Sequence, residues 1–250
     1  VTGTDSVWLN IGRIYVGNAA TAAGNTLNVY SGGRLLNTGN AVTLGGVNSK
    51  FNIGDGTGVS TALVQSVSLS TASSVLNFNG GVLRLNSAGS VTGAGAVSNS
   101  GSAFVDTVAG NASIGSTIVG GGALVKISAN TLTLSGTNTF TGPTIVSNGV
   151  LQTQSPSCLS WYTDVILPTG GGNIYLDYIG TNIVKSIVVN GTPLAYGLYK
   201  AGDAGGRITG GSGYLEIVAP TWTNIASGNW SVGGNWRDGV APNAGGRGSY

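Results

Sequence analysis

The residues that could do chemistry are few and widely spaced. The chain of 250 residues has no histidine and only eight acidic residues. A paired-carboxylate hydrolase holds two acidic groups across one bond, and an activated nucleophile needs an adjacent base. The sequence shows neither arrangement directly, so we expect no catalytic residue, although stacked turns of chain could still bring two carboxylates together. The acidic residues are Asp5, Asp55, Asp106, Asp164, Asp177, Asp203, Glu216 and Asp238.

No motif predicts a metal or a cofactor. Asn52 to Gly58 is similar to a single Ca²⁺-binding nonapeptide turn. Such turns bind Ca²⁺ through neighbouring copies, so a lone copy predicts a plain turn. Cys158 is the one cysteine, which excludes an intramolecular disulfide. We interpret it as a small buried apolar residue, and the alternative is a reactive thiol or an intermolecular bridge.

Aromatic residues offer the best candidates for binding. Exposed Trp and Tyr rings stack on sugars and anchor protein interfaces. We therefore expect subunit contacts or glycan stacking at Trp8, Tyr15, Trp222, Trp230 and Trp236. For the last three, the interpretation that we favour is that they fill the core of a tail segment.

Composition excludes several classes of partner. Charged residues make up 7% of the chain, against about 25% in ordinary soluble domains, and glycine accounts for 45 residues. The formal net charge is +2 and the basic residues are scattered, so we expect no nucleic-acid partner. No apolar run approaches the roughly 18 residues needed to cross a bilayer, so we expect no membrane insertion by this chain.

Short strand-like segments position the candidate residues named above. From residue 1 to 154, Val, Ile and Leu alternate with polar residues, and Gly or Asn closes each phrase. Alternation with period two buries one face of a strand, and Gly or Asn tolerates the corner conformations. Regular punctuation favours an all-β coil of stacked rungs, with roughly 20 to 25 residues per rung.

The most informative stretch, Gly122 to Gln152, reads GALVKISANTLTLSGTNTFTGPTIVSNGVLQ. It resembles the autotransporter-associated β-strand repeat of secreted bacterial passenger proteins, which reads L-x-K followed by T-L-T-L-S-G-x-N-T-Y/F-T-G-x-T-x-V-x-x-G-x-L-Q. The departures are Ser128-Ala129-Asn130 in place of a Gly-containing turn, and Pro143. The resemblance implies a right-handed parallel β-helix (solenoid). A weaker likeness to passenger repeats covers Val16-Gly17-Asn18 and Gly24 to Gly33.

The pattern of strand-like segments changes near Ser155. Residues 155–219 carry longer strand phrases and the hairpin signal Asn190-Gly191, and they resemble the unit that closes such arrays, with Leu198 in place of Thr. We predict a C-terminal β-rich capping module there. Residues 220–250 form a Trp-rich tail similar to segments between arrays, which predicts a linker or the start of the next repeat.

These patterns predict a non-enzymatic, extracellular structural or adhesive protein, exported by a bacterium as a piece of a longer precursor. We expect a surface stalk or fibre built by end-to-end strand contacts, with self-association or strand exchange through Val1 to Val16 and Thr221 to Tyr250. Cell-surface glycans are the other expected partner. The alternative function is a polysaccharide-binding or polysaccharide-degrading β-helix protein, which would need a groove with clustered carboxylates.

Overall fold

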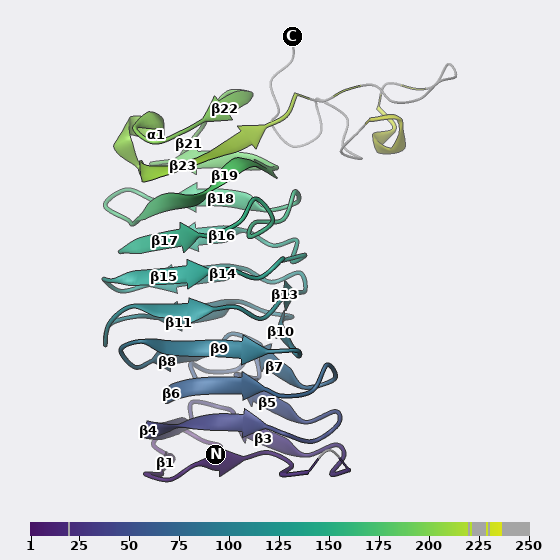
Figure 1. Ribbon diagram of the computed structural model, residues 1–250, viewed down its shortest axis with the longest axis vertical. Coiled ribbons are helices and arrows are strands. Elements are labelled where there is room, and N and C mark those ends of the chain that lie inside the picture. The colour runs from purple at the N-terminus through teal and green to yellow at the C-terminus, as the bar shows by residue number, and fades with distance from the viewer. Residues whose placement is uncertain (20, 220, 222–228, 230, 237–250) are drawn as a thin grey trace.

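The chain winds into a tall stack of β-strands. The structure, a computed structural model, describes residues 1–19, 21–219, 221, 229 and 231–236. The N-terminus lies at one end of the stack, and the strands follow one another upward in chain order (Figure 1). Nearly all strand pairs are parallel and join one turn to the next, so the described part of the chain is a parallel β-solenoid. The predicted all-β coil is confirmed.

Each turn contributes strands to three faces, which we name A, B and C. Face A is a continuous parallel ladder. Its strands are β1 (Val7–Leu9), β4 (Arg34–Leu44), β6 (Thr61–Leu69), β8 (Val82–Leu85), β11 (Ala103–Asp106), β14 (Leu124–Ile127), β16 (Thr144–Val146), β18 (Asp164–Leu167) and β20 (Ser186–Val189). The longer strands β4 and β6 bend round a corner, and their second halves lie on face B.

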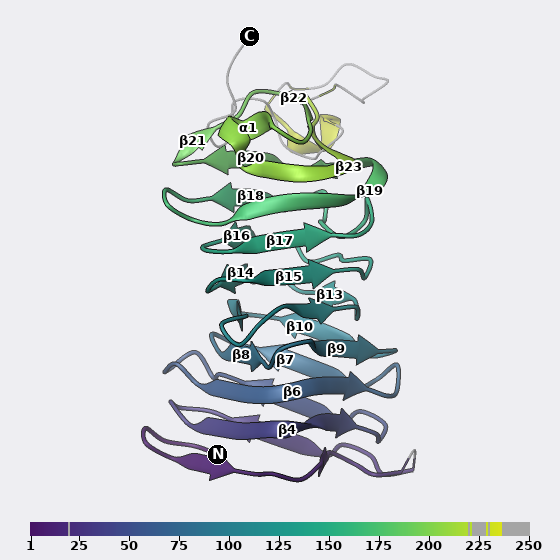
Figure 2. The same cartoon turned by 60° about the vertical axis from the view of Figure 1, so that its left-hand side comes forward.

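Faces B and C complete the coil. Besides the halves of β4 and β6, face B holds β2 (Ile14–Tyr15), β9 (Gly89–Gly93), β12 (Ala112–Ile114), β15 (Thr131–Leu134), β17 (Val150–Thr153), β19 (Asn173–Val184) and β23 (Ile208–Ile217). Face C holds β3 (Thr26–Val29), β5 (Lys50–Ile53), β7 (Val75–Phe78), β10 (Ala96–Asn99) and β13 (Ile118–Val119). Figure 2 shows face B strands running across the stack, one above another.

The core lies inside the coil and is supplied by every second residue of each strand. In β7 and β8 the pattern alternates between half-buried and buried positions, as the sequence predicts. The largest buried side chains include Phe51 and Phe78 on face C, where Phe51 lies in register with Leu76 and Phe78 with Ile53. The first two turns, from Val7 to Arg34 and from there to Thr61, exceed the expected rung length because their corner loops are long.

Glycines allow consecutive turns to approach closely at the corner between faces C and A. A Cβ on Gly122 would lie 1.8 Å from the carbonyl oxygen of Gly101, and a Cβ on Gly142 would lie 2.1 Å from that of Gly122. No side chain fits at such distances. These glycines therefore set how tightly the coil winds.

The upper end contains a different kind of pairing. β21 (Thr192–Pro193) pairs antiparallel with β20, and β22 (Gly197–Tyr199) pairs antiparallel with β23. The turn between β20 and β21 is Asn190-Gly191, both with positive φ, which confirms the predicted hairpin. A short helix α1 (Asp203–Gly206) precedes β23, and a 3-10 turn covers Gly233–Asn235. Parallel pairing continues across residue 155 through β18 and β19, and the division into coil and cap stays a prediction.

Candidate functional site

The first turn of the coil has an open lower edge. Within the described residues, β1 and β2 each pair with β4 and with no other strand. Trp8 lies in register with Leu35, which lies in register with Ala62. Leu35 and Ala62 are fully buried, whereas Trp8 is 39% exposed. Trp8 thus occupies a core position that, among the described residues, only the turn of β4 covers.

Apolar side chains also gather on the outside of this turn. Val7, Leu9, Ile11 and Tyr15 are all exposed, Ile11 by 83%. Single exposed apolar residues are common, but a contiguous group on one end of a molecule marks a contact surface. We name residues 7–15 the open first turn. Its free strand edge and its apolar side chains together form the candidate site.

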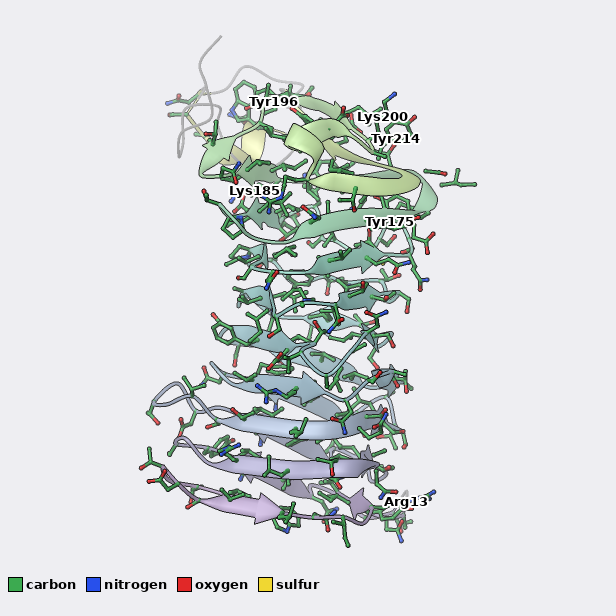
Figure 3. The ribbon with its side chains drawn as sticks, turned by 90° about the vertical axis from the view of Figure 1, so that its left-hand side faces the viewer. Arg13, Tyr175, Lys185, Tyr196, Lys200 and Tyr214 are labelled. Carbon is green, nitrogen blue, oxygen red and sulfur yellow. The ribbon has the colours of Figure 1, made fainter. Side chains whose placement is uncertain are left out.

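The predicted contact residues do not form one aromatic platform. Trp8 belongs to face A, whereas Tyr15 belongs to face B, where its hydroxyl accepts a hydrogen bond from Arg13 at 3.3 Å. Figure 3 shows Arg13 at the lower end of the coil. Trp236 is 6% exposed, so its ring is packed and not offered to a ligand. Trp222 and Trp230 lie outside the described residues.

Two carboxylates of the described residues form an ion pair with a neighbouring turn. Asp106 is bound by Arg84, with Nη2 and Oδ2 2.6 Å apart, and Asp164 is bound by Lys185 at 2.8 Å. Figure 3 shows Lys185 near the upper end. Over the described ranges, no three His, Cys, Asp or Glu side chains form a group that could hold a metal ion. No helix in that part of the chain is long and apolar enough to span a membrane.

The turn at Asp55 is held by its own neighbours. The Asp55 carboxylate accepts hydrogen bonds from the hydroxyls of Ser31 and Thr57 and from the backbone N–H of Thr57. These bonds hold the pKa of Asp55 well below its ordinary range. Its oxygens are therefore engaged in shaping a corner of the coil, as the interpretation of a plain turn expects.

Lys126 is the polar residue that sequence reasoning missed. It is fully buried and points into the coil, in register with Val105 and Val146. Its Nζ donates to three backbone carbonyls, those of Ile127 at 3.0 Å, Ser128 at 2.7 Å and Asn148 at 3.0 Å. The one signal for it was the L-x-K phrase of the repeat. Lys126 joins the corners of two successive turns.

Burial and charge compete at this corner. Burial lowers the pKa of Lys126 to about 8, and the nearby Asp106 opposes that shift. Burial also opposes the ionisation of Asp106, but hydrogen bonds from Ser128 and Val108 and the charge of Arg84 hold the pKa of Asp106 below its ordinary value. The cluster stabilises the coil, since all its donors and acceptors are spent on the chain itself.

Asparagine side chains supplement backbone hydrogen bonds on the upper part of face C. There the chain is irregular, and the amide of Asn138 bridges three turns. Its Oδ1 accepts from the N–H of Ile118 at 2.8 Å, and its Nδ2 donates to the carbonyl of Cys158 at 2.7 Å. One turn higher, Asn182 accepts from the N–H of Leu159 and donates to its carbonyl. Cys158 is fully buried, as predicted.

Comparison with known proteins identifies part of the coil. Residues 124–153, which run from β14 through β17, match the family model of the passenger-associated-transport-repeat. The match covers 30 of the 250 residues. The passenger repeat and the β-solenoid together fit an autotransporter passenger repeat family, in agreement with the resemblance seen in the sequence. No curated protein and no solved structure matches the chain.

The geometry explains why the passenger repeat has its sequence. Its apolar residues fill the coil, its Asn bridges turns, its Lys joins corners, and Gly149 adopts a φ of 71° at the turn before β17. The fully buried apolar members are Leu132, Leu134, Phe140, Val146 and Leu151. Every one of these roles requires a turn above or below. The repeat therefore encodes stacking.

Proposed function

We propose that this chain is a structural segment of a secreted or surface-exposed bacterial passenger, a stalk that extends through its open first turn. The observation that carries the proposal is the exposure of Trp8 at a core position. A free parallel edge presents unpaired N–H and C=O groups, which another strand can satisfy. An added turn would also bury the apolar side chains at residues 7–15.

The occupant we propose is an end turn of a second copy of this chain. A coil with the same three-sided path can pair with β1 and β2 together, although they lie on different faces. The upper end of the coil is less suited to this contact than the first turn. There β20 and β23 already have antiparallel partners in β21 and β22, which protects part of that edge. The first turn is then the surface from which the stalk extends.

A structural role agrees with where the charged groups are used. Asp106, Asp164 and Lys126 each stabilise a junction between successive turns. A carbohydrate-cleaving coil would instead direct such groups into a shared groove. The outward Asn ladder of face C, in which Asn77 donates to Asn52 and Asn52 donates to Asn28, likewise ties turn to turn.

Negative-stain electron microscopy with light scattering tests the proposal. Eight steps of about 4.8 Å make a single coil about 38 Å long. We expect longer particles and masses above 24.7 kDa for the unaltered chain. Leu9→Asp should return them to single rods, because it places a charge in the contact. Ile179→Asp, at a site 89% exposed near the upper end, is the matched control and should change nothing. Single rods of the unaltered chain at all concentrations would contradict the proposal.

A further inference from the structure

Face A carries a continuous apolar column on its outer side. The column follows the register of six successive strands, in which each member pairs with the next. Its members are Val82, Phe104, Val125, Ile145, Ile166 and Val188. Their neighbours along each strand, such as Leu83 and Val165, are fully buried inside the coil. Because side chains alternate along a strand, the column points outward; Val125 is 7% exposed and the other five members are half-buried. We call it the face A stripe.

The other two faces are mostly polar in the corresponding positions, with Tyr175 on face B and Val119 on face C as apolar members. On face B the outward residues of successive turns include Ser90, Ser113, Thr133 and Gln152. On face C they include Asn28, Asn52, Asn77 and Ser98. Hydration of the surface by hydroxyls and amides is thus general on this coil, and face A departs from it. Figure 2 shows the strands of that face, β8, β14, β16, β18 and β20, stacked along the left side.

The stripe is not dictated by the passenger repeat. The repeat pattern fixes Leu124 and Lys126 around one member of the stripe, and Thr144 and Val146 around another, all of which point inward or are buried. It leaves the outward positions 125 and 145 open. In this chain both hold β-branched apolar residues, in line with the strands before and after the repeat. The apolar character is therefore a property of this chain's own outer surface.

Charges beside the stripe are neutralised within the chain. The two ion pairs found among the described residues both lie on face A, Arg84 with Asp106 and Lys185 with Asp164. Each joins successive turns, and each places one positive and one negative group side by side. A surface of this kind carries no net charge. It can therefore approach an identical surface without like-charge repulsion.

We propose that the face A stripe is a lateral interface through which two copies of this chain pack side by side. A flat parallel ladder has a repeat of about 4.8 Å, and the surface that matches this repeat over several turns is another ladder of the same kind. Two such faces interdigitate about 10 Å apart, as in stacked sheets. A second copy offers that ladder together with the same neutral, apolar outer column.

The size of the stripe sets the strength of the contact. Five spacings of about 4.8 Å give a length of about 24 Å, and one four-residue strand is about 13 Å wide. The resulting patch, on the order of 300 Å², is below the roughly 800 Å² per partner of a standard interface. The lateral pair is therefore weak and concentration-dependent. It strengthens where many copies are held on one surface, because the second and later contacts become intramolecular.

Sedimentation equilibrium and small-angle scattering test the inference. The experiment uses the full chain with Leu9→Asp, so that contact through the open first turn does not contribute. We expect the mass to rise from one toward two copies as concentration rises, while the maximum dimension stays near one rod and the cross-section grows. Adding Ile145→Thr and Ile166→Thr should weaken this association at least tenfold. Threonine keeps the β-branched shape and removes apolar surface.

The matched control replaces apolar outward residues elsewhere by the same type of change. Val119→Thr on face C and Ile179→Thr leave the stripe intact and should leave the association unchanged. Circular dichroism verifies that all variants remain folded. A single-copy mass at millimolar concentration would overturn the inference. Equal weakening by the control variant, or growth in length with constant cross-section, would also overturn it.

Discussion

The side chain of Asn138 donates a hydrogen bond to the backbone carbonyl of Cys158, 2.7 Å away in the next turn. The same side chain accepts from the N–H of Ile118 in the turn before. On this part of face C the backbone is too irregular for regular pairing. The amide therefore adds to the backbone hydrogen bonds that join these turns, and it does so at a buried position.

Replacing Asn138 by Ala should lower the free energy of unfolding by about 2–4 kcal/mol, because one buried N–H and one buried carbonyl lose their partner. Urea unfolding followed by circular dichroism measures this. Asn77→Ala is the matched control, since Asn77 makes a ladder bond on the outer side of face C. We expect that control to lose under about 1 kcal/mol. Equal losses in both variants would show that the Asn138 bridge contributes no more to stability than an outer ladder bond.

The sequence predicted the coil because its signals are local. Alternation and corner residues occur within single strands, and Asn190-Gly191 defines a hairpin by itself. The passenger repeat was also visible in the sequence, as a contiguous string. These features need no knowledge of which turn lies above which. The all-β fold, the hairpin and the burial of Cys158 could therefore be predicted.

The features that were missed depend on register. The alternating pattern assigns a lysine to the solvent-facing side of a strand. One of the carbonyls that accept from Lys126 is that of Asn148, which lies in the following turn. The partners of Asn138 lie one turn away on each side. The face A stripe appears only when Phe104, Val125 and Ile145 are aligned. Corner loops of unequal length set that alignment. Tertiary packing decides where each loop begins and ends.

Gly142→Ala should destabilise the coil by about 1–3 kcal/mol or more, since its methyl group would lie 2.1 Å from the carbonyl oxygen of Gly122. Gly121→Ala is a stringent control one turn below. At that site the nearest atom is the Thr141 hydroxyl oxygen, 3.8 Å away. We expect Gly121→Ala to stabilise by about 0.4–1 kcal/mol through the unfolded state. Thermal unfolding separates the two, and a stable Gly142→Ala protein would contradict the close approach.

The Cys158 thiol should react slowly with a thiol reagent in the native protein and rapidly in urea. It is fully buried, and its Sγ lies 3.1 Å from the carbonyl oxygen of Leu134. Reaction therefore requires local opening of the coil. Ser157→Cys in a Cys158→Ser background moves the thiol to an exposed neighbour and should react at once. Fast reaction of native Cys158 would contradict its burial and favour the alternative of a reactive thiol.

Lys126→Met should lower the free energy of unfolding at pH 7 by about 1–3 kcal/mol, because three backbone carbonyls lose their shared donor. Methionine fills a similar volume, so the change isolates the polar role. Lys185→Met is the control, since its side chain is 41% exposed and binds Asp164 at the surface. That pair should contribute under about 1 kcal/mol. Chemical denaturation measures the free energy of unfolding of both variants. A larger loss for Lys126→Met shows that Lys126 joins two turns, and equal small losses show that it acts as an ordinary surface charge.

The stability contributed at Lys126 should also depend on pH in a definite direction. Its pKa is lowered to about 8 in the folded chain, from the ordinary 10.5. Between these values the unfolded chain binds the proton that the folded chain has released, so stability rises with pH across this window. The wild type should gain up to about 3 kcal/mol relative to Lys126→Met between pH 7.5 and about 10.5. Comparing the two proteins cancels the titration of the tyrosines. If the difference in unfolding free energy between the two proteins stayed flat or fell with pH, the three carbonyls would hold the ammonium charge at least as firmly as water does.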